Sequence, residues 1–122
     1  MSGFLESIRR HLRFRKRTHA REERDGLIHL FGPGGLLGPA QLLDESSGGA
    51  RILCEVPHHI SAATHMLNPE KGEAHKIEFA WTNGPSAGVK YLKTTNVRGY
   101  VDAEFEPMKA FWTMRTVRHL LA

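Results

Sequence analysis

Residues 76–92 read Lys-Ile-Glu-Phe-Ala-Trp-Thr-Asn-Gly-Pro-Ser-Ala-Gly-Val-Lys-Tyr-Leu, and this stretch decides the fold class. Large apolar side chains occupy every second position of its first part, namely Ile77, Phe79 and Trp81, as in a strand with one buried face. The turn sequence at 83–85 then leads into a second apolar segment at 88–92. The stretch therefore predicts an antiparallel hairpin.

The chain before this hairpin consists of short segments separated by glycine and proline. Strands are predicted at 27–31, 39–43 and 50–56, with turns at 32–35 and 44–49 and with Pro57 ending the third strand. Residues 58–72 favour neither a helix nor a strand. One more strand is predicted at 97–105, with Val101, Ala103 and Phe105 on one face. Several short strands joined by turns indicate an all-β dominated fold, a small antiparallel β-barrel.

Helices are predicted near both ends of the chain. Pro107 suits the first turn of a C-terminal α-helix over 107–122. The apolar stripe of this helix, suited to the core or to a contact between copies of the chain, consists of Ala110, Phe111, Met114, Val117, Leu120 and Leu121. Apolar residues at helical spacing in 3–14 predict a short amphipathic helix that docks on the body or frays in solvent.

The positive charge is concentrated in one segment. The 122 residues have a formal net charge of +4, yet residues 1–24 contain eight basic and three acidic residues, or +5. The rest of the chain is then near neutral, at −1. We expect three parts: a basic N-terminal arm at 1–24, a barrel at 25–106 and the helix at 107–122.

Cysteine content and hydropathy favour a cytoplasmic protein. The sole cysteine, Cys54, excludes a disulfide framework within the chain. No apolar run approaches the ~20 residues of a membrane-spanning helix, so no stable membrane span is expected. The N-terminus lacks the apolar core of a signal peptide.

Two motifs have side chains suited to ligand binding. Arg17 and Arg21 lie four residues apart just before the first strand, and guanidinium groups bind phosphates and guanine edges in a bidentate manner. The segment Asp44-x-Ser46-x-x-Gly49 offers a carboxylate and a hydroxyl next to a glycine that permits close approach. Each motif also has a simpler interpretation, a solvated basic face and a local Asx turn, respectively.

Together, and in this order, the two motifs resemble those of the PilZ domain family, Arg-x-x-x-Arg followed by Asp/Asn-x-Ser-x-x-Gly. The similarity extends over about residues 16–93, because the hairpin at 77–91 is similar to the family's closing Val-x-Trp and Gly-Val-x-Phe segments. The resemblance implies a six-stranded β-barrel that binds the bacterial second messenger cyclic di-GMP. It further implies an effector protein, whose identity the sequence does not reveal.

The resemblance also implies a role for individual residues. Arg17 and Arg21 would contact the phosphates and the Hoogsteen edges of the guanines. Asp44 and Ser46 would hydrogen-bond a guanine, and Gly49 would let the ligand approach the backbone. Two further positions complete the candidate site: Lys16, whose position influences whether one ligand or a stacked pair binds, and Trp81, which borders the ligand or packs in the core.

Several alternatives remain open at this stage. The arginine pairs Arg9/Arg13 and Arg13/Arg17 have the same spacing as Arg17/Arg21, which we favour for its distance from Asp44. A nucleic-acid-binding protein could use the basic arm, although the body offers no basic excess. A PilZ-type adaptor without ligand, or a homo-oligomer formed through the C-terminal helix, is a further possibility.

Enzymatic and metal chemistry receive little support from the sequence. The spacing of His58, His59, His65 and His75 fits no recognised zinc pattern. The glycine-rich turn at 32–35 lacks the lysine of a phosphate-binding loop, and no nucleophile-and-base arrangement stands out. We therefore expect no catalytic activity, no metal and no cofactor.

Overall fold

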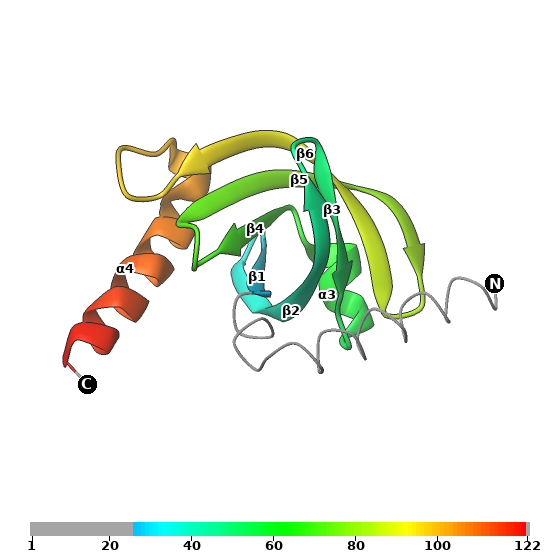
Figure 1. The fold of residues 1–122 in the computed structure, drawn as a ribbon, viewed down its shortest axis with the longest axis horizontal. Helices are drawn as coiled ribbons and strands as arrows, with labels where there is room; N and C mark the ends of the chain where they lie inside the picture. The colour runs from blue at the N-terminus through cyan, green and yellow to red at the C-terminus, as the bar shows by residue number, and fades with distance from the viewer. Residues whose placement is uncertain (1–25, 122) are drawn as a thin grey trace.

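The computed structural model describes residues 26–121 and shows six antiparallel strands closed into a barrel (Figure 1). The strands are β1 (Leu27–Gly32), β2 (Gly35–Ser46), β3 (Gly49–Leu53), β4 (His65–Asn68), β5 (Glu73–Asn83) and β6 (Ser86–Asn96). Helix α3 (Pro57–Ala62) follows β3, and a 3₁₀ helix, η1 (Ala103–Phe105), leads into α4 (Glu106–Leu121). The predicted all-β barrel with a C-terminal helix is thus confirmed, whereas the arm at 1–24 lies outside the described residues.

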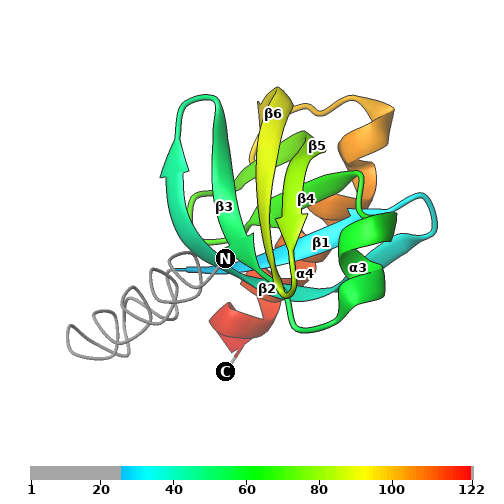
Figure 2. The ribbon, with the colours of Figure 1, turned by 90° about the vertical axis from the view of Figure 1, so that its right-hand side faces the viewer.

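The order of strands around the barrel is β1-β2-β3-β6-β5-β4, and β4 pairs with β1 to close it. Strands β2 and β3 form one hairpin, and β5 and β6 form another. Strand β3 also pairs with β6, which lies far from it in the sequence. Figure 2 shows β3 beside β6 in the wall of the barrel. The β3–β6 contact brings the turn of the Asp-x-Ser-x-x-Gly motif next to the predicted hairpin.

The β5–β6 hairpin is confirmed and is longer than predicted. Its two-residue turn begins at Gly84, whose φ of 60° favours glycine. Ile77 is buried as the alternation predicts, but a register shift between Phe79 and Trp81 interrupts the ladder. Trp81 is consequently 39% exposed and does not belong to the core.

The prediction of a strand at 97–105 is wrong. Strand β6 ends at Asn96, whose Oδ1 accepts a hydrogen bond from the backbone N–H of Arg98 at 2.8 Å. Val101 and Phe105 are buried, whereas Ala103, predicted on the same face, is exposed. The buried positions therefore lack the period of two that a strand requires.

The segment 58–72 contains one helix and one strand. Pro57 stands in the first turn of α3, where its missing N–H is not needed. Ile60 and Ala63 pack into the barrel core, and β4 follows with three buried residues. The four residues of β4 are too few for an alternation of apolar and polar side chains to be visible in the sequence.

Two apolar clusters stabilise the molecule. The first fills the barrel and includes Ile28, Leu30, Ile52, Met66 and Ile77. The second joins one end of the barrel to α4; its buried members are Phe31, Leu67, Ala74, Val97, Val101, Phe105 and Met108. The partly buried rings of Phe111 and Trp112 pack against this second cluster.

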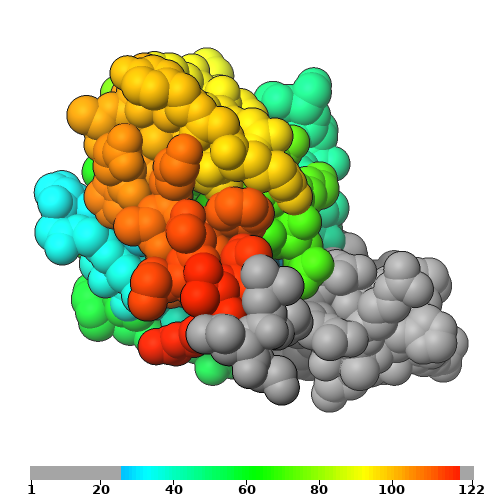
Figure 3. All heavy atoms as spheres, turned by 90° about the vertical axis from the view of Figure 1, so that its left-hand side faces the viewer, coloured from blue at the N-terminus to red at the C-terminus, as the bar shows by residue number. Residues whose placement is uncertain are grey.

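Helix α4 begins at Glu106, with Pro107 in its first turn as predicted. The predicted stripe is confirmed in part, because Phe111 packs against the second cluster. Ala110, Met114 and Val117 are exposed, while Met108 is buried at 2%. Figure 3 shows α4, in orange to red, lying on the surface of the barrel. No helix within residues 26–121 is long and apolar enough to cross a membrane.

Candidate functional site

The described members of the predicted site line one open depression of about 500 Å³ on the barrel wall. Its lining residues come from the β2–β3 hairpin and from the facing part of β5 and β6, and include Asp44, Ser46, Gly49 and Trp81. Lys16, Arg17 and Arg21 lie outside the described residues. The barrel therefore brings together four of the seven predicted residues from segments more than 30 positions apart.

Asp44 faces Arg51 across the β2–β3 hairpin. The two residues are register partners, and the guanidinium Nη2 donates to Asp44 Oδ2 at 2.6 Å. The carboxylate side chain is 56% exposed, so it remains accessible to a ligand. Arg51 Nε is buried and has no hydrogen-bond partner among the described residues. This pair places one negative and one positive group side by side in the depression.

Ser46 and Gly49 flank the two-residue turn at 47–48 and pair with each other. Ser46 is exposed, so its hydroxyl can reach a ligand. A Cβ at Gly49 would lie 2.2 Å from the carbonyl oxygen of Val89 on β6. Gly49 is therefore required by the close β3–β6 contact itself, which differs from the ligand-approach role that the motif implies.

Trp81 forms one side of the depression and covers Gly88. A Cβ at Gly88 would lie 2.2 Å from Trp81 Nε1, so the indole lies close above the backbone of β6. With its exposed fraction of 39%, the indole presents part of a flat surface to solvent. Such a surface can stack against a purine base.

Two cations that neither sequence motif includes also line the depression, Arg51 and Lys90. A two-residue loop at 47–48 would have revealed Arg51, because counting back along both strands pairs it with Asp44. The predicted turn at 44–49 is too long, because residues up to Ser46 belong to β2. No comparable signal identified Lys90, since the β3–β6 contact is not local.

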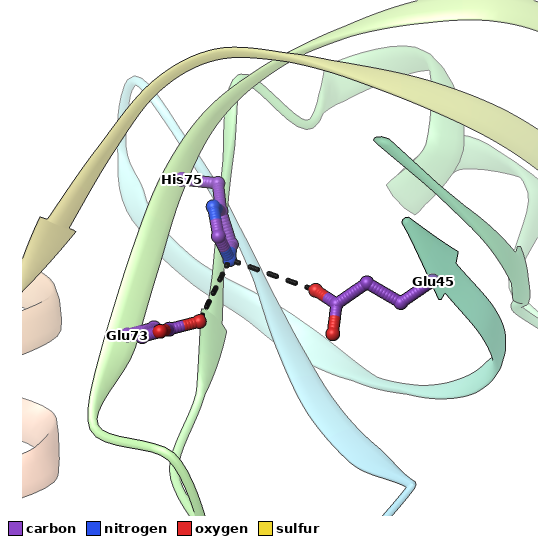
Figure 4. A group of neighbouring side chains, drawn as sticks. All are labelled: Glu45, Glu73 and His75. Atoms are coloured by element: carbon purple, nitrogen blue, oxygen red, sulfur yellow. Dashed lines mark ion pairs between the residues drawn. The ribbon is translucent and has the colours of Figure 1, made fainter. Parts of the chain in front are cut away.

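A second depression, of about 430 Å³, adjoins the first at Glu45 and Ser46. In it His75 of β5 points toward the carboxylates of Glu45 and Glu73 (Figure 4). His75 Nε2 lies 3.8 Å from Glu73 Oε1 and 4.0 Å from Glu45 Oε2. Within the described part of the chain this is the one group of three side chains placed to hold a metal ion.

The charges of this second depression are set by burial and by hydrogen bonds. Burial lowers the pKa of His75, which outweighs the attraction of the two nearby glutamates. Burial raises the pKa of Glu45, but hydrogen bonds from Lys71 and Tyr91 outweigh it, so that its pKa lies below the ordinary value. A neutral imidazole and an ionised carboxylate are thus favoured near neutral pH.

The other histidines considered from the sequence lie elsewhere. His58 and His59 contact each other on α3, with ring centroids 4.5 Å apart. His65 Nε2 lies 2.8 Å from Glu104 Oε1 at the end of the barrel near η1. The four histidines therefore do not form one cluster, and only His75 meets two carboxylates among the residues described.

Comparison with protein-family models, curated proteins and solved structures finds no match for this chain.

Proposed function

We propose that this protein is a cyclic di-GMP receptor of the PilZ type. The observation that carries the proposal is the position of Asp44, Ser46, Gly49 and Trp81 around one depression of a closed six-stranded barrel. Its volume of about 500 Å³ is within the range of ~300–1,000 Å³ that is typical of small-ligand sites. The sequence motifs supply the identity of the ligand.

In this proposal the Asp44–Arg51 pair opens when the ligand binds. The carboxylate of Asp44 accepts hydrogen bonds from a guanine N1–H and N2–H, replacing the bond from Arg51. The released guanidinium is then available to a phosphate of the dianionic ligand. Exchanging one partner for another avoids leaving either charge without a partner.

The basic arm supplies the second half of the site. Arg17 and Arg21 contact the phosphates and guanines, and the arm closes over the ligand held at the depression. Contact of the arm with the ligand would change the surface that an effector protein meets. Ligand binding is in this way coupled to a partner interaction.

Isothermal titration of the full chain with cyclic di-GMP tests the proposal. Wild-type protein should bind, and Arg17→Ala or Arg21→Ala should weaken binding at least tenfold, because each removes a bidentate phosphate or guanine contact. Asp44→Asn should weaken binding as well and reduce the preference for guanine, measured against cyclic di-AMP. The stoichiometry of the titration distinguishes one ligand from a stacked pair.

Arg9→Ala is the matched control, since it removes the same charge from the same arm. Its affinity should remain within about twofold of wild type if the contacts are specific rather than generic attraction between charges. Absence of binding to the wild-type chain would favour the ligand-free adaptor. Equal weakening by Arg9→Ala and Arg17→Ala would contradict the assignment of the arginine pair.

A further inference from the structure

One ring nitrogen of His75, Nε2, is buried. The side chain is 3% exposed, and Nε2 has no hydrogen-bond partner among the described residues. The other ring nitrogen, Nδ1, lies 2.8 Å from Thr94 Oγ1, and the ring stacks on Tyr91 at a centroid distance of 3.8 Å. The imidazole is therefore held in place with Nε2 directed at the carboxylates of Glu45 and Glu73.

The groups that Nε2 faces are two carboxylates. At 3.8 and 4.0 Å, Glu73 Oε1 and Glu45 Oε2 are beyond hydrogen-bond distance. If Nδ1–H donates to Thr94, a lone pair on Nε2 faces two negative groups at close range. A cation between the three atoms would satisfy all of them.

We propose that Glu45, Glu73 and His75 form a binding site for a divalent transition-metal ion, of which zinc is the best fit. One imidazole and two carboxylates are ligands that zinc accepts, with water in the fourth position. Two ligand atoms of a tetrahedral zinc ion lie roughly 3.4 Å apart, given bond lengths of about 2.1 Å. The three ligand atoms already lie within 4.8 Å of one another, and Glu73, at 40% exposed, can rotate to close the difference.

The surroundings resemble those of a metal-ligating histidine. Such histidines usually donate the second ring N–H to a fixed acceptor, and here Thr94 Oγ1 is in position to accept it. Two carboxylates and a neutral imidazole would balance the charge of a divalent ion.

Lys71 competes with the metal for Glu45. Its Nζ lies 2.5 Å from Glu45 Oε1, while the hydroxyl of Tyr91 donates to Oε2. The Lys71 side chain is 53% exposed and can move into solvent when a metal ion binds. Removal of this ammonium group should therefore raise the affinity for metal.

The test is a competition titration of the full-length protein with Zn²⁺ and a chromogenic chelator, repeated with Co²⁺ to record its visible absorption. His75→Gln and Glu73→Gln should each weaken Zn²⁺ binding at least tenfold and abolish the Co²⁺ spectrum. Lys71→Gln should strengthen Zn²⁺ binding severalfold. The gain with Lys71→Gln cannot arise from misfolding, so it remains decisive if His75→Gln disturbs the barrel.

His58→Gln is the matched control, because it removes an exposed histidine from a chain with eight of them. Its affinity should equal that of wild type. Equal affinities for wild type, His75→Gln and Lys71→Gln would overturn the site and assign any bound metal to other histidines. The outcome is independent of cyclic di-GMP, since the titration contains none.

Discussion

At the scale of single residues, Gly49 belongs both to the candidate motif and to a place in the barrel wall where no side chain fits. A Cβ at this position would meet the backbone of Val89, which cannot move without shifting β6. Gly49→Ala should therefore lower the free energy of unfolding by about 1–3 kcal/mol, as overpacking does elsewhere. Chemical denaturation measured with and without ligand checks this expectation.

Gly48→Ala is the natural comparison, because a Cβ at Gly48 would meet nothing within 4 Å. Its stability should stay within about 0.5 kcal/mol of wild type. If Gly49→Ala were as stable as Gly48→Ala and lost only ligand affinity, the glycine would act at the ligand and not in the wall.

The residues of the candidate site differ in how far the sequence could predict them. Asp44, Ser46 and Gly49 lie within six positions, so their motif is visible along the chain. Arg51 depends on the register of one turn and could have been deduced. Glu45 and His75 are 30 positions apart and meet only because β2 and β5 approach within the closed barrel, which no local pattern indicates.

At the scale of secondary-structure elements, α4 packs on the barrel through Phe111 of the predicted stripe and through two residues outside it, Met108 and Trp112. Trp112 packs against the second apolar cluster, and its Nε1 donates to the carbonyl oxygen of Pro69 at 3.1 Å. The guanidinium of Arg98 lies 5.3 Å from the ring centroid. This one side chain thus joins α4 to the β4–β5 turn and to the loop after β6.

Trp112→Ala should destabilise the protein by about 2 kcal/mol, less than the ~3–5 kcal/mol of fully buried aromatic residues, because Trp112 is only partly buried. Met114→Ala, on the predicted stripe but 59% exposed, should change stability by less than about 0.5 kcal/mol. Thermal unfolding followed by circular dichroism compares the two. The opposite ranking would mean that Met114, and not Trp112, attaches the helix.

Elements whose signal is local were the ones predicted from the sequence. The hairpin at 76–92 and the helix from Pro107 both depend on neighbouring residues, and both are present. The strand at 97–105 failed because Val97, Val101 and Phe105 are buried by an irregular loop that packs against the end of the barrel. The prediction that apolar residues of this segment are buried is confirmed, but the predicted period of two is wrong.

At the scale of the whole molecule, closure depends on pairings that the sequence does not display. The β1–β4 ladder consists of three residue pairs and yet converts an open sheet into a barrel. Short strands and frequent turns predicted this fold class, because such a sheet must remove its exposed edges. The pairing of β3 with β6, which is also non-local, places the β2–β3 turn beside β6, where the candidate site lies.

The distribution of charge over the chain leads to a prediction about salt. Eight basic residues at 1–24 stand against a remainder of −1, so a polyanion would be attracted by the arm alone. If the arm bound nucleic acid through about 6–10 phosphates, affinity would fall about 10³–10⁵-fold between about 50 and 200 mM salt. Cyclic di-GMP has two phosphates and also contacts Asp44, so its affinity should fall by less than about tenfold over the same range.

Titrations of cyclic di-GMP and of a short DNA duplex at the two salt concentrations, each with wild type and Asp44→Asn, separate the two functions. A receptor shows a shallow salt dependence with cyclic di-GMP and a loss of affinity in Asp44→Asn, because the carboxylate addresses the guanine and not the charge. Nucleic-acid binding by the arm would show a steep dependence with DNA and no effect of Asp44→Asn. Asp44→Asn therefore separates the two functions, because only binding of cyclic di-GMP depends on the carboxylate that pairs with Arg51.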